Sequence, residues 1–230
     1  MSMPASVLTP PLREGDLLSR EEFMRRWEAM PDLYFAELID GIVHMASPLS
    51  NPHSQSQLRL GKWLLDYADA TPGCEAGSSG TWLMSKDSVP QPDLALRILE
   101  EHGGQSRLEG EYPAGAPELI VEVSHTTSVR DSGVKLRLYE RSGVCEYLIV
   151  LTKKKQVIWR ELENGKYREI VAGPDGILRS RVFPGLWLDE AALWKRDIPR
   201  LAAVAQQGVA SVEHAEFVRK LGRPPLKTIN

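Results

Sequence analysis

A five-residue run, Leu119-Ile120-Val121-Glu122-Val123, constrains the fold of this chain more than any other segment. All of its residues except Glu122 are apolar, which is typical of a central strand that is buried on both faces. Such a strand requires helices packed on each side of its sheet. The sequence therefore predicts an α/β fold, in which a mixed central β-sheet is flanked by helices.

Capping and turn signals place the other elements around this strand. Ser19 followed by Glu22 is a capping-box pattern and predicts a helix from Ser19 that ends before Pro31. Asp40-Gly41 predicts a type I′ hairpin turn, because both of its central residues need positive φ. Further helices are predicted at 53–70, 131–142, 191–206 and 212–221, further strands at 33–39, 42–46, 74–76, 81–85, 93–98 and 146–151, a hairpin around Asn164-Gly165, and a polar loop at 101–115.

The length of 230 residues suits one α/β domain with short terminal additions. We predict an irregular N-terminal arm at 1–18, one domain at 19–190 and a C-terminal helical extension at 191–230. The sequence has neither a signal-peptide pattern nor a run of about 18 apolar residues, so a cytoplasmic location without membrane contact is predicted. Cys74 and Cys145 lie in apolar, strand-like settings and are expected to be buried thiols.

The net charge of −3 does not favour a protein that holds nucleic acid by charge alone. Basic residues nevertheless outnumber acidic ones between Arg130 and Lys155, and Lys135 is among them. This segment could form a local positive surface. A solvated helix face followed by a charged hairpin explains the same pattern, and charge alone does not separate the two interpretations.

Glu122 carries the clearest chemical implication. A carboxylate in a buried strand is costly unless it is paired or binds a cation, because burial disfavours the charged form. Asp93 opens another apolar strand, directly after Gln91-Pro92. If the two strands are neighbours, Asp93 and Glu122 can converge on a hard divalent cation, which prefers oxygen ligands. A structural ion pair is the alternative for each acid taken alone.

Lys135 and Glu37 could complete such a site. Lys135 lies on the predicted helix after the Glu122 strand, where an ammonium group could orient water or neutralise charge that develops on a phosphate. Glu37 is embedded in apolar sequence and could hold water near a metal or accept a hydrogen bond from Lys135. The alternatives are a solvated lysine and an ion pair at a strand edge.

Five sequence blocks occur in the order seen in a known family. They are Glu37-Leu38-Ile39-Asp40-Gly41, Gln91-Pro92-Asp93-Leu94-Ala95, Ala116 to Ser124, Asp131 to Tyr139 with Lys135, and Gly143-Val144-Cys145-Glu146-Tyr147. In this order the chain resembles the Uma family of restriction-endonuclease-like proteins, within the PD-(D/E)XK nuclease superfamily. The resemblance covers about residues 15 to 190, and ordered blocks at matching spacing are more specific than any single motif.

The resemblance implies a restriction-endonuclease-like core, magnesium or manganese as the metal, and hydrolysis of phosphodiester bonds in nucleic acid, expected to be DNA. Asp93 and Glu122 match the metal-binding acids, Glu37 matches the acid near the first helix, and Lys135 resembles a lysine displaced onto the following helix. These four are the predicted catalytic residues. The predicted metal ligands are Asp93, Glu122 and Val123. A homodimer is also implied, because many nucleases of this type cut two strands with two sites.

Three positions depart from the family pattern, and a fourth resembles it but has two alternative roles. The usual lysine position, two residues after Glu122, holds Ser124, so activity depends on Lys135 reaching the site from its helix. Glu118 stands where an aspartate is frequent, and Leu148 replaces a frequent tryptophan, which should affect packing only. His53 resembles a recurrent histidine that could cap its helix or contact substrate.

No other catalytic pattern competes with this one. The sequence lacks a phosphate-binding loop and a Gly-x-Ser-x-Gly motif, its histidines show no metal-ligand spacing, and its tryptophans are expected in the core. Two functions stay open: a metal-dependent nuclease, and a binding or scaffold module in which the acids only pair with Lys135. Ser124 favours the second.

Overall fold

The computed structural model describes residues 9–45, 47–124 and 133–222 of the chain. A six-stranded sheet forms its centre. The strands are β3 (Cys74–Ser78), β4 (Leu94–Ile98), β7 (Leu119–Ser124), β8 (Glu146–Leu151), β9 (Gln156–Glu163) and β10 (Lys166–Glu169). Their order across the sheet is β10-β9-β8-β7-β4-β3, and β7 and β8 are parallel whereas the other pairs are antiparallel. The predicted mixed sheet is confirmed, and β7 and β8 are buried along their whole length.

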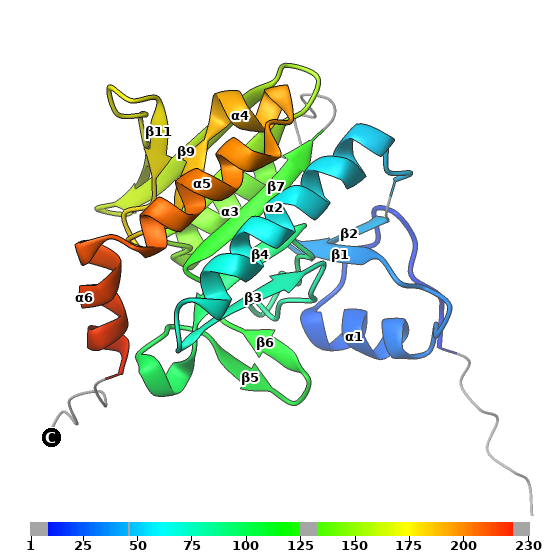
Figure 1. Ribbon diagram of the computed structural model, residues 1–230. Helices are drawn as coiled ribbons and strands as arrows, with labels where there is room; N and C mark the ends of the chain where they lie inside the picture. Colours follow the sequence, from blue (N-terminus) through cyan, green and yellow to red (C-terminus); the bar gives the residue numbers. More distant parts are fainter. Residues whose placement is uncertain (1–8, 46, 125–132, 223–230) are drawn as a thin grey trace, which may run out of the picture.

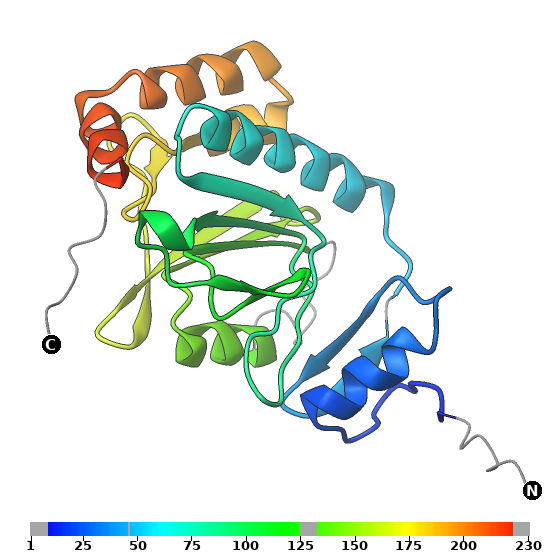
Figure 2. The same cartoon turned by 90° about the horizontal axis from the view of Figure 1, so that it is seen from below.

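Helices cover both faces of this sheet (Figures 1 and 2). α2 (Asn51–Asp69) and α5 (Ile198–Val209) lie on one face, and α3 (Lys135–Ser142) lies on the other. Side chains alternate across β7, so Val121 and Val123 join the core beneath α2, and Ile120 joins the core beneath α3. Glu122, two residues after Ile120, therefore lies on the α3 face.

An N-terminal unit packs beside one end of the sheet (Figure 1). It contains α1 (Arg20–Glu28) and the hairpin of β1 (Ala36–Ile39) with β2 (Ile42–Met45). Ser19 caps α1, and Asp40 and Gly41 have φ of 53° and 77°, so the predicted cap and type I′ turn are confirmed. A bridge between Leu38 and Val89 ties β1 to the segment before β4. This contact brings Glu37 of β1 to the end of the main sheet at which β4 begins.

The segment from 81 to 115 differs from the prediction. The strand expected at 81–85 is wrong: the N–H of Trp82 bonds to Pro90 and that of Met84 to Ser88, so the chain folds back locally and forms only isolated bridges. The expected polar loop at 101–115 contains a short helix, η1 (Glu100–His102), and a hairpin, β5 (Arg107–Glu109) with β6 (Tyr112–Ala114). These strands have three residues each, too few for an alternating pattern to be visible in the sequence.

The C-terminal part contains more elements than expected. The single helix predicted at 191–206 is two helices, α4 (Glu190–Lys195) and α5, because Arg196 adopts φ of 57° and Asp197 caps a new helix. The pair β11 (Ile177–Arg179) and β12 (Trp187–Asp189) was not predicted. α6 (Val212–Leu221) is confirmed. Leu193 of α4 belongs to the main core, and the predicted domain boundary at 190 stays a prediction.

Several predicted features lie partly outside the described residues. They are the first eight residues of the arm, Ala46, the start of the helix at Asp131, and the tail from Arg223. Within the described part, α3 ends at Gly143 with φ of 84°, as the sequence predicts. Cys74 and Cys145 are half-buried free thiols, and burial raises their pKa to about 12 and about 11.

Candidate active site

Asp93 and Glu122 come together at one end of neighbouring strands. Leu94 of β4 pairs with Val121 of β7, so the register places Asp93, one residue before β4, opposite Glu122. An oxygen of Asp93 (Oδ2) accepts the N–H of Val123 at 2.7 Å. The two acids therefore lie side by side on one face of the sheet, as the prediction of a shared site requires.

Lys135 reaches this site from the first turn of α3. Its Nζ lies 2.9 Å from Oε1 of Glu122 and 2.8 Å from Oε1 of Glu37. The Lys135 and Glu122 side chains are only 8% and 7% exposed, so water screens the ion pair weakly. Lys135 thus contacts Glu122 in the fold, although it follows Glu122 by thirteen residues in the sequence.

Glu122 and Lys135 shape each other's ionisation. Burial raises the pKa of Glu122, Lys135 opposes the shift, and the nearby charges of Asp93 and Glu37 add to it, so that the pKa reaches about 8. Burial acts to lower the pKa of Lys135, but the carboxylates of Glu122 and Glu37 outweigh it and hold that pKa well above its usual value. The two carboxylates therefore stabilise the ammonium form of Lys135.

One side-chain donor and one main-chain donor hold these groups in place. Tyr139, one helical turn after Lys135, donates its hydroxyl to Oε1 of Glu122 at 2.8 Å. The N–H of Gln91 donates to Oε1 of Glu37, also at 2.8 Å. Tyr139 was not predicted as part of the site, although its i+4 spacing from Lys135 places both side chains on one helix face.

His53 belongs to the cluster through its ring. Its Nε2 lies 3.2 Å from Oδ1 of Asp93, and this hydrogen bond raises the pKa of His53 against the opposing effect of burial. Ser50, and not His53, caps α2. The capping role considered for His53 is therefore wrong. Gln57, one turn along α2, donates to the main-chain oxygen of Asp93 at 3.1 Å.

The cluster holds more negative than positive groups. Glu37, Asp93 and Glu122 face one lysine, which favours binding of a cation. Among the described residues, the hydrogen bonds that Glu122 accepts from Lys135 and Tyr139 both end on Oε1. In the same part of the chain, no three His, Cys, Asp or Glu side chains lie close enough to form a metal site by themselves. A cation here would need main-chain or water oxygens besides Asp93 and Glu122.

The remaining predicted positions have structural roles. Glu118 is buried and accepts the N–H groups of Ile98 and Gln105, so it joins β4 to the loop before β5. Leu148 is fully buried, as expected for a packing residue. Lys135 is buried and does not contribute to the positive surface considered between Arg130 and Lys155. Arg130 itself lies outside the described residues.

A family model described as "Uma2: Putative restriction endonuclease" matches residues 20–191, about three quarters of the chain. The chain belongs to this family. The resemblance predicted from the five sequence blocks is thereby confirmed, and membership supports a nuclease. No curated protein matches the chain.

A solved structure agrees with the fold of this family member. It is described as the crystal structure of "a putative nuclease belonging to DUF820 from Anabaena variabilis ATCC 29413". The TM-score is 0.60 at 16% sequence identity, over 77% of this chain and 98% of that one. An identity this low supports the fold alone. Within the described residues, none of the helices has the length and apolar composition needed to cross a bilayer.

Proposed function

We propose that the protein is a magnesium- or manganese-dependent endonuclease of the PD-(D/E)XK type that hydrolyses phosphodiester bonds, with DNA as the expected substrate. The observation that carries this proposal is the contact of Lys135 with Glu122 on the face where Asp93 also lies. A metal-binding acid pair and an ammonium group are the components that such chemistry needs, and here they come from separate elements of a nuclease-family fold.

The donor set fits a hard divalent cation. Asp93 and Glu122 would hold it, and the main-chain oxygen of Val123 is the third proposed ligand. The main-chain oxygens of Glu118 and Ser124 accept hydrogen bonds from the β8 side of β7. Because main-chain groups alternate in direction along a strand, the N–H and C=O of Val123 point towards β4. The register continued by two residues places Pro92 opposite Val123, and proline has no N–H to donate to that oxygen. Magnesium commonly keeps several waters besides one or two carboxylates.

The bound cation would supply Lewis-acid stabilisation of a phosphate oxygen. The protein's own groups would do the rest. Lys135 places a positive charge next to Glu122, where it can orient an attacking water and stabilise charge that develops on the phosphate. Glu37 and Tyr139 keep the Lys135 ammonium and the Glu122 carboxylate in position. The hydrogen bond between His53 and one oxygen of Asp93 would fix the orientation of that carboxylate.

A second function is favoured by the same ion pairs. Because Lys135 bonds to both Glu37 and Glu122, the acids could serve only to neutralise a buried lysine in a module that binds nucleic acid or a protein. Ser124 at the usual lysine position supports this alternative. The two functions differ in whether the acids bind a metal and whether nucleic acid is cut.

Metal titration and cleavage assays test the proposal together. Calorimetry with Mn²⁺ and Mg²⁺ on the wild type should give binding heats that disappear in an Asp93→Ala, Glu122→Ala double variant. In cleavage assays on several DNA and RNA forms, Glu122→Gln should lower the rate by about 10²- to 10³-fold. Glu146→Gln, a change at another buried acid, is the matched control and should cut normally while folded. Equal heats in the wild type and the double variant would rule out the metal site.

A further inference from the structure

The two edges of the central sheet differ in how they are protected. β10 carries Lys166, Arg168 and Glu169, and charged residues on an edge strand prevent pairing with another chain. β3, with the sequence Cys-Glu-Ala-Gly-Ser, has one charged residue, Glu75, which is already bonded to Arg97. The β3 edge therefore lacks the usual protection.

The register shows which main-chain groups β3 leaves open. At its two ends, Ser79 donates to Asp93 and Leu99 donates to Gly73, so odd-numbered residues of β3 face β4. The N–H and C=O of Ala76, in the middle of the strand, therefore point away from the sheet. No main-chain bond of Ala76 occurs among the described residues outside the ladder itself. A second strand could pair here.

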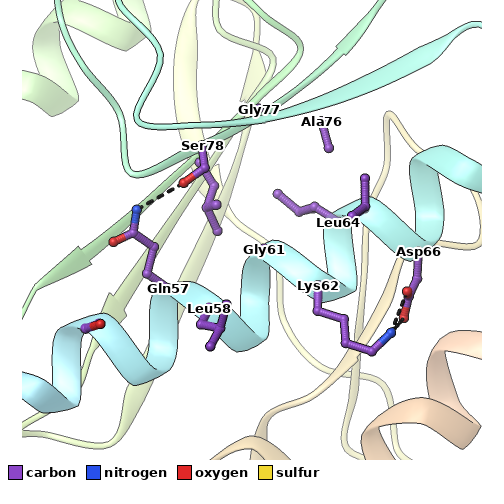
Figure 3. A pocket seen from close by; sticks show the side chains of 12 residues that line it. Gln57, Leu58, Gly61, Lys62, Leu64, Asp66, Ala76, Gly77 and Ser78 are labelled. Carbon is purple, nitrogen blue, oxygen red and sulfur yellow. Dashed lines mark hydrogen bonds and ion pairs between the residues drawn. The ribbon is translucent and has the colours of Figure 1, made fainter.

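A groove of about 660 Å³ runs between this edge and α2 (Figure 3). Leu58, Leu64 and Leu65 of α2 line it, together with Ala76 and Gly77 of β3. Leu58 and Leu65 are two helical turns apart and are 72% and 52% exposed. The open strand edge thus has exposed leucine side chains of α2 beside it, so a partner that covers this whole surface must contact both β3 and α2.

The charges on α2 are arranged symmetrically about Leu64. Lys62 precedes Leu64 by two residues and Asp66 follows it by two; within one chain these two side chains form an exposed ion pair at 2.6 Å, and both residues line the groove. An antiparallel second α2 centred on Leu64 would place Lys62 of one copy opposite Asp66 of the other. Ala76 and Leu64 both line the groove, and Figure 3 shows Ala76 on its β3 side and Leu64 on its α2 side. The centre of an antiparallel β3 pair and the centre of the helix charge pattern therefore lie at the same groove.

We propose that this surface is a two-fold interface with a second copy of the chain, in which β3 pairs with β3 about Ala76 and α2 packs against α2. A two-fold axis makes each contact occur twice, so such an interface requires that each copy carry both charges and a strand with an open edge. The pairing joins two six-stranded sheets into one. The proposal does not depend on nuclease activity, because mass and cross-linking report it directly.

Charge exchange on α2 tests the helix contact. Sedimentation analysis of the full chain should show a dimer that dissociates on dilution. Lys62→Glu should weaken dimerisation at least about tenfold, and Lys62→Glu combined with Asp66→Lys should restore it. Lys166→Glu, at the other sheet edge, is the control and should not change the dimer. A monomer at every concentration, or a dimer insensitive to Lys62→Glu, would overturn the proposal.

Disulfide cross-linking tests the strand register. Antiparallel pairing about Ala76 places Glu75 opposite Gly77 of the other copy in a non-hydrogen-bonded pair, with Cα atoms about 4.5 Å apart, which is within disulfide range. A Cβ added at Gly77 meets no atom within 4 Å. Mixed Glu75→Cys and Gly77→Cys chains should cross-link on oxidation, whereas each variant alone should not. Equal cross-linking in the mixture and in the separate variants, or none in the mixture, would exclude this register, and capture of an unrelated peptide at β3 would replace the second copy as occupant.

Discussion

Glu122 of β7 and Glu146 of β8 are buried acids on neighbouring parallel strands, yet their surroundings differ in kind. Glu146 accepts hydrogen bonds from Trp159, Ser180 and the main-chain N–H groups of 181 and 182, all of them neutral donors. Glu122 contacts a lysine and a tyrosine, and the charges of Asp93 and Glu37 lie near it. Glu146 has all its acceptor positions occupied, whereas Glu122 is surrounded by other charges.

This difference shows that burial alone does not identify a functional acid. Neutral donors that saturate a carboxylate fix a loop to the sheet, and here Glu146 joins β8 to the segment after β11. Several acids that share one lysine leave an excess of negative charge, which a cation can neutralise. The two acids differ in which groups contact their carboxylates. Contacts between residues that are distant in sequence can be identified only from the fold.

Removing the lysine should have the largest effect. Lys135→Met leaves Glu122 and Glu37 without their ammonium partner and should lower the free energy of unfolding by about 3 kcal/mol or more. Chemical denaturation followed by circular dichroism measures it. Adding Glu122→Gln to Lys135→Met should recover part of the loss, because one buried charge is removed. If the double variant is less stable than Lys135→Met, the two groups do not form the coupled pair described.

Removing the saturated acid should affect stability without affecting metal binding. Glu146→Ala leaves the donors of Trp159 and Ser180 and two main-chain N–H groups unpaired, at a cost of about 2–4 kcal/mol. For a chain of this size the melting temperature should fall by roughly 2–4 °C per kcal/mol. Calorimetric heats of Mn²⁺ binding, measured while the variant is folded, should match those of the wild type. Loss of these heats would contradict the separation of the two acids.

The same acid should give stability a defined pH dependence. Burial raises the pKa of Glu146 from 4.5 to about 6, against its hydrogen bonds. A raised carboxyl pKa stabilises the fold below pH 4.5, and this contribution is lost as pH rises through 6, by about 2 kcal/mol. The free energy of unfolding of the wild type, minus that of Glu146→Gln, should therefore fall between pH 4.5 and pH 7. If this quantity stays constant or rises over the range, Glu146 titrates elsewhere.

The smallest expected effect concerns the tyrosine that positions Glu122. Tyr139→Phe removes one hydrogen bond to Oε1 and should cost about 1 kcal/mol of stability. Because the Glu122 carboxylate then depends on Lys135 alone, cleavage should also slow, by about tenfold or less. Tyr167→Phe, which removes a hydroxyl bonded to the main chain of Val144, is the control for stability without slower cleavage. An equal decrease in cleavage for both variants would assign Tyr139 a purely structural role.

The sequence predicted the centre of the fold well, because the signals there are local. A run that is apolar except for Glu122 identifies β7, Asp40-Gly41 and Asn164-Gly165 identify hairpin turns, and Ser19 identifies a helix start. Short elements were missed where three residues give no periodicity, as in β5 and β11. The long helix at 191–206 was wrong because the break at Arg196 depends on a left-handed residue that no glycine signals.

The site was predicted in part for a related reason. Glu37, Asp93 and Glu122 were selected as acids in or beside apolar sequence, and Lys135 was selected for its place on the helix after the Glu122 strand and for its resemblance to a family lysine. The fold brings all four together. Their catalytic roles stay predictions. His53 and Tyr139 were harder to select, because a histidine near a helix start and a tyrosine on a helix face have several ordinary roles. Only the contacts of these two residues with Asp93 and Glu122 identify them as site residues.

The hydrogen bond from Val123 to the side chain of Asp93 has a consequence for the history of such proteins. Asp93 completes the main-chain pairing of β7 at the point where Pro92 interrupts the neighbouring strand. A relative without cleavage activity would still benefit from keeping this aspartate, since its loss leaves the N–H of Val123 without this hydrogen bond. Retention of the aspartate among relatives therefore does not by itself separate working enzymes from inactive ones.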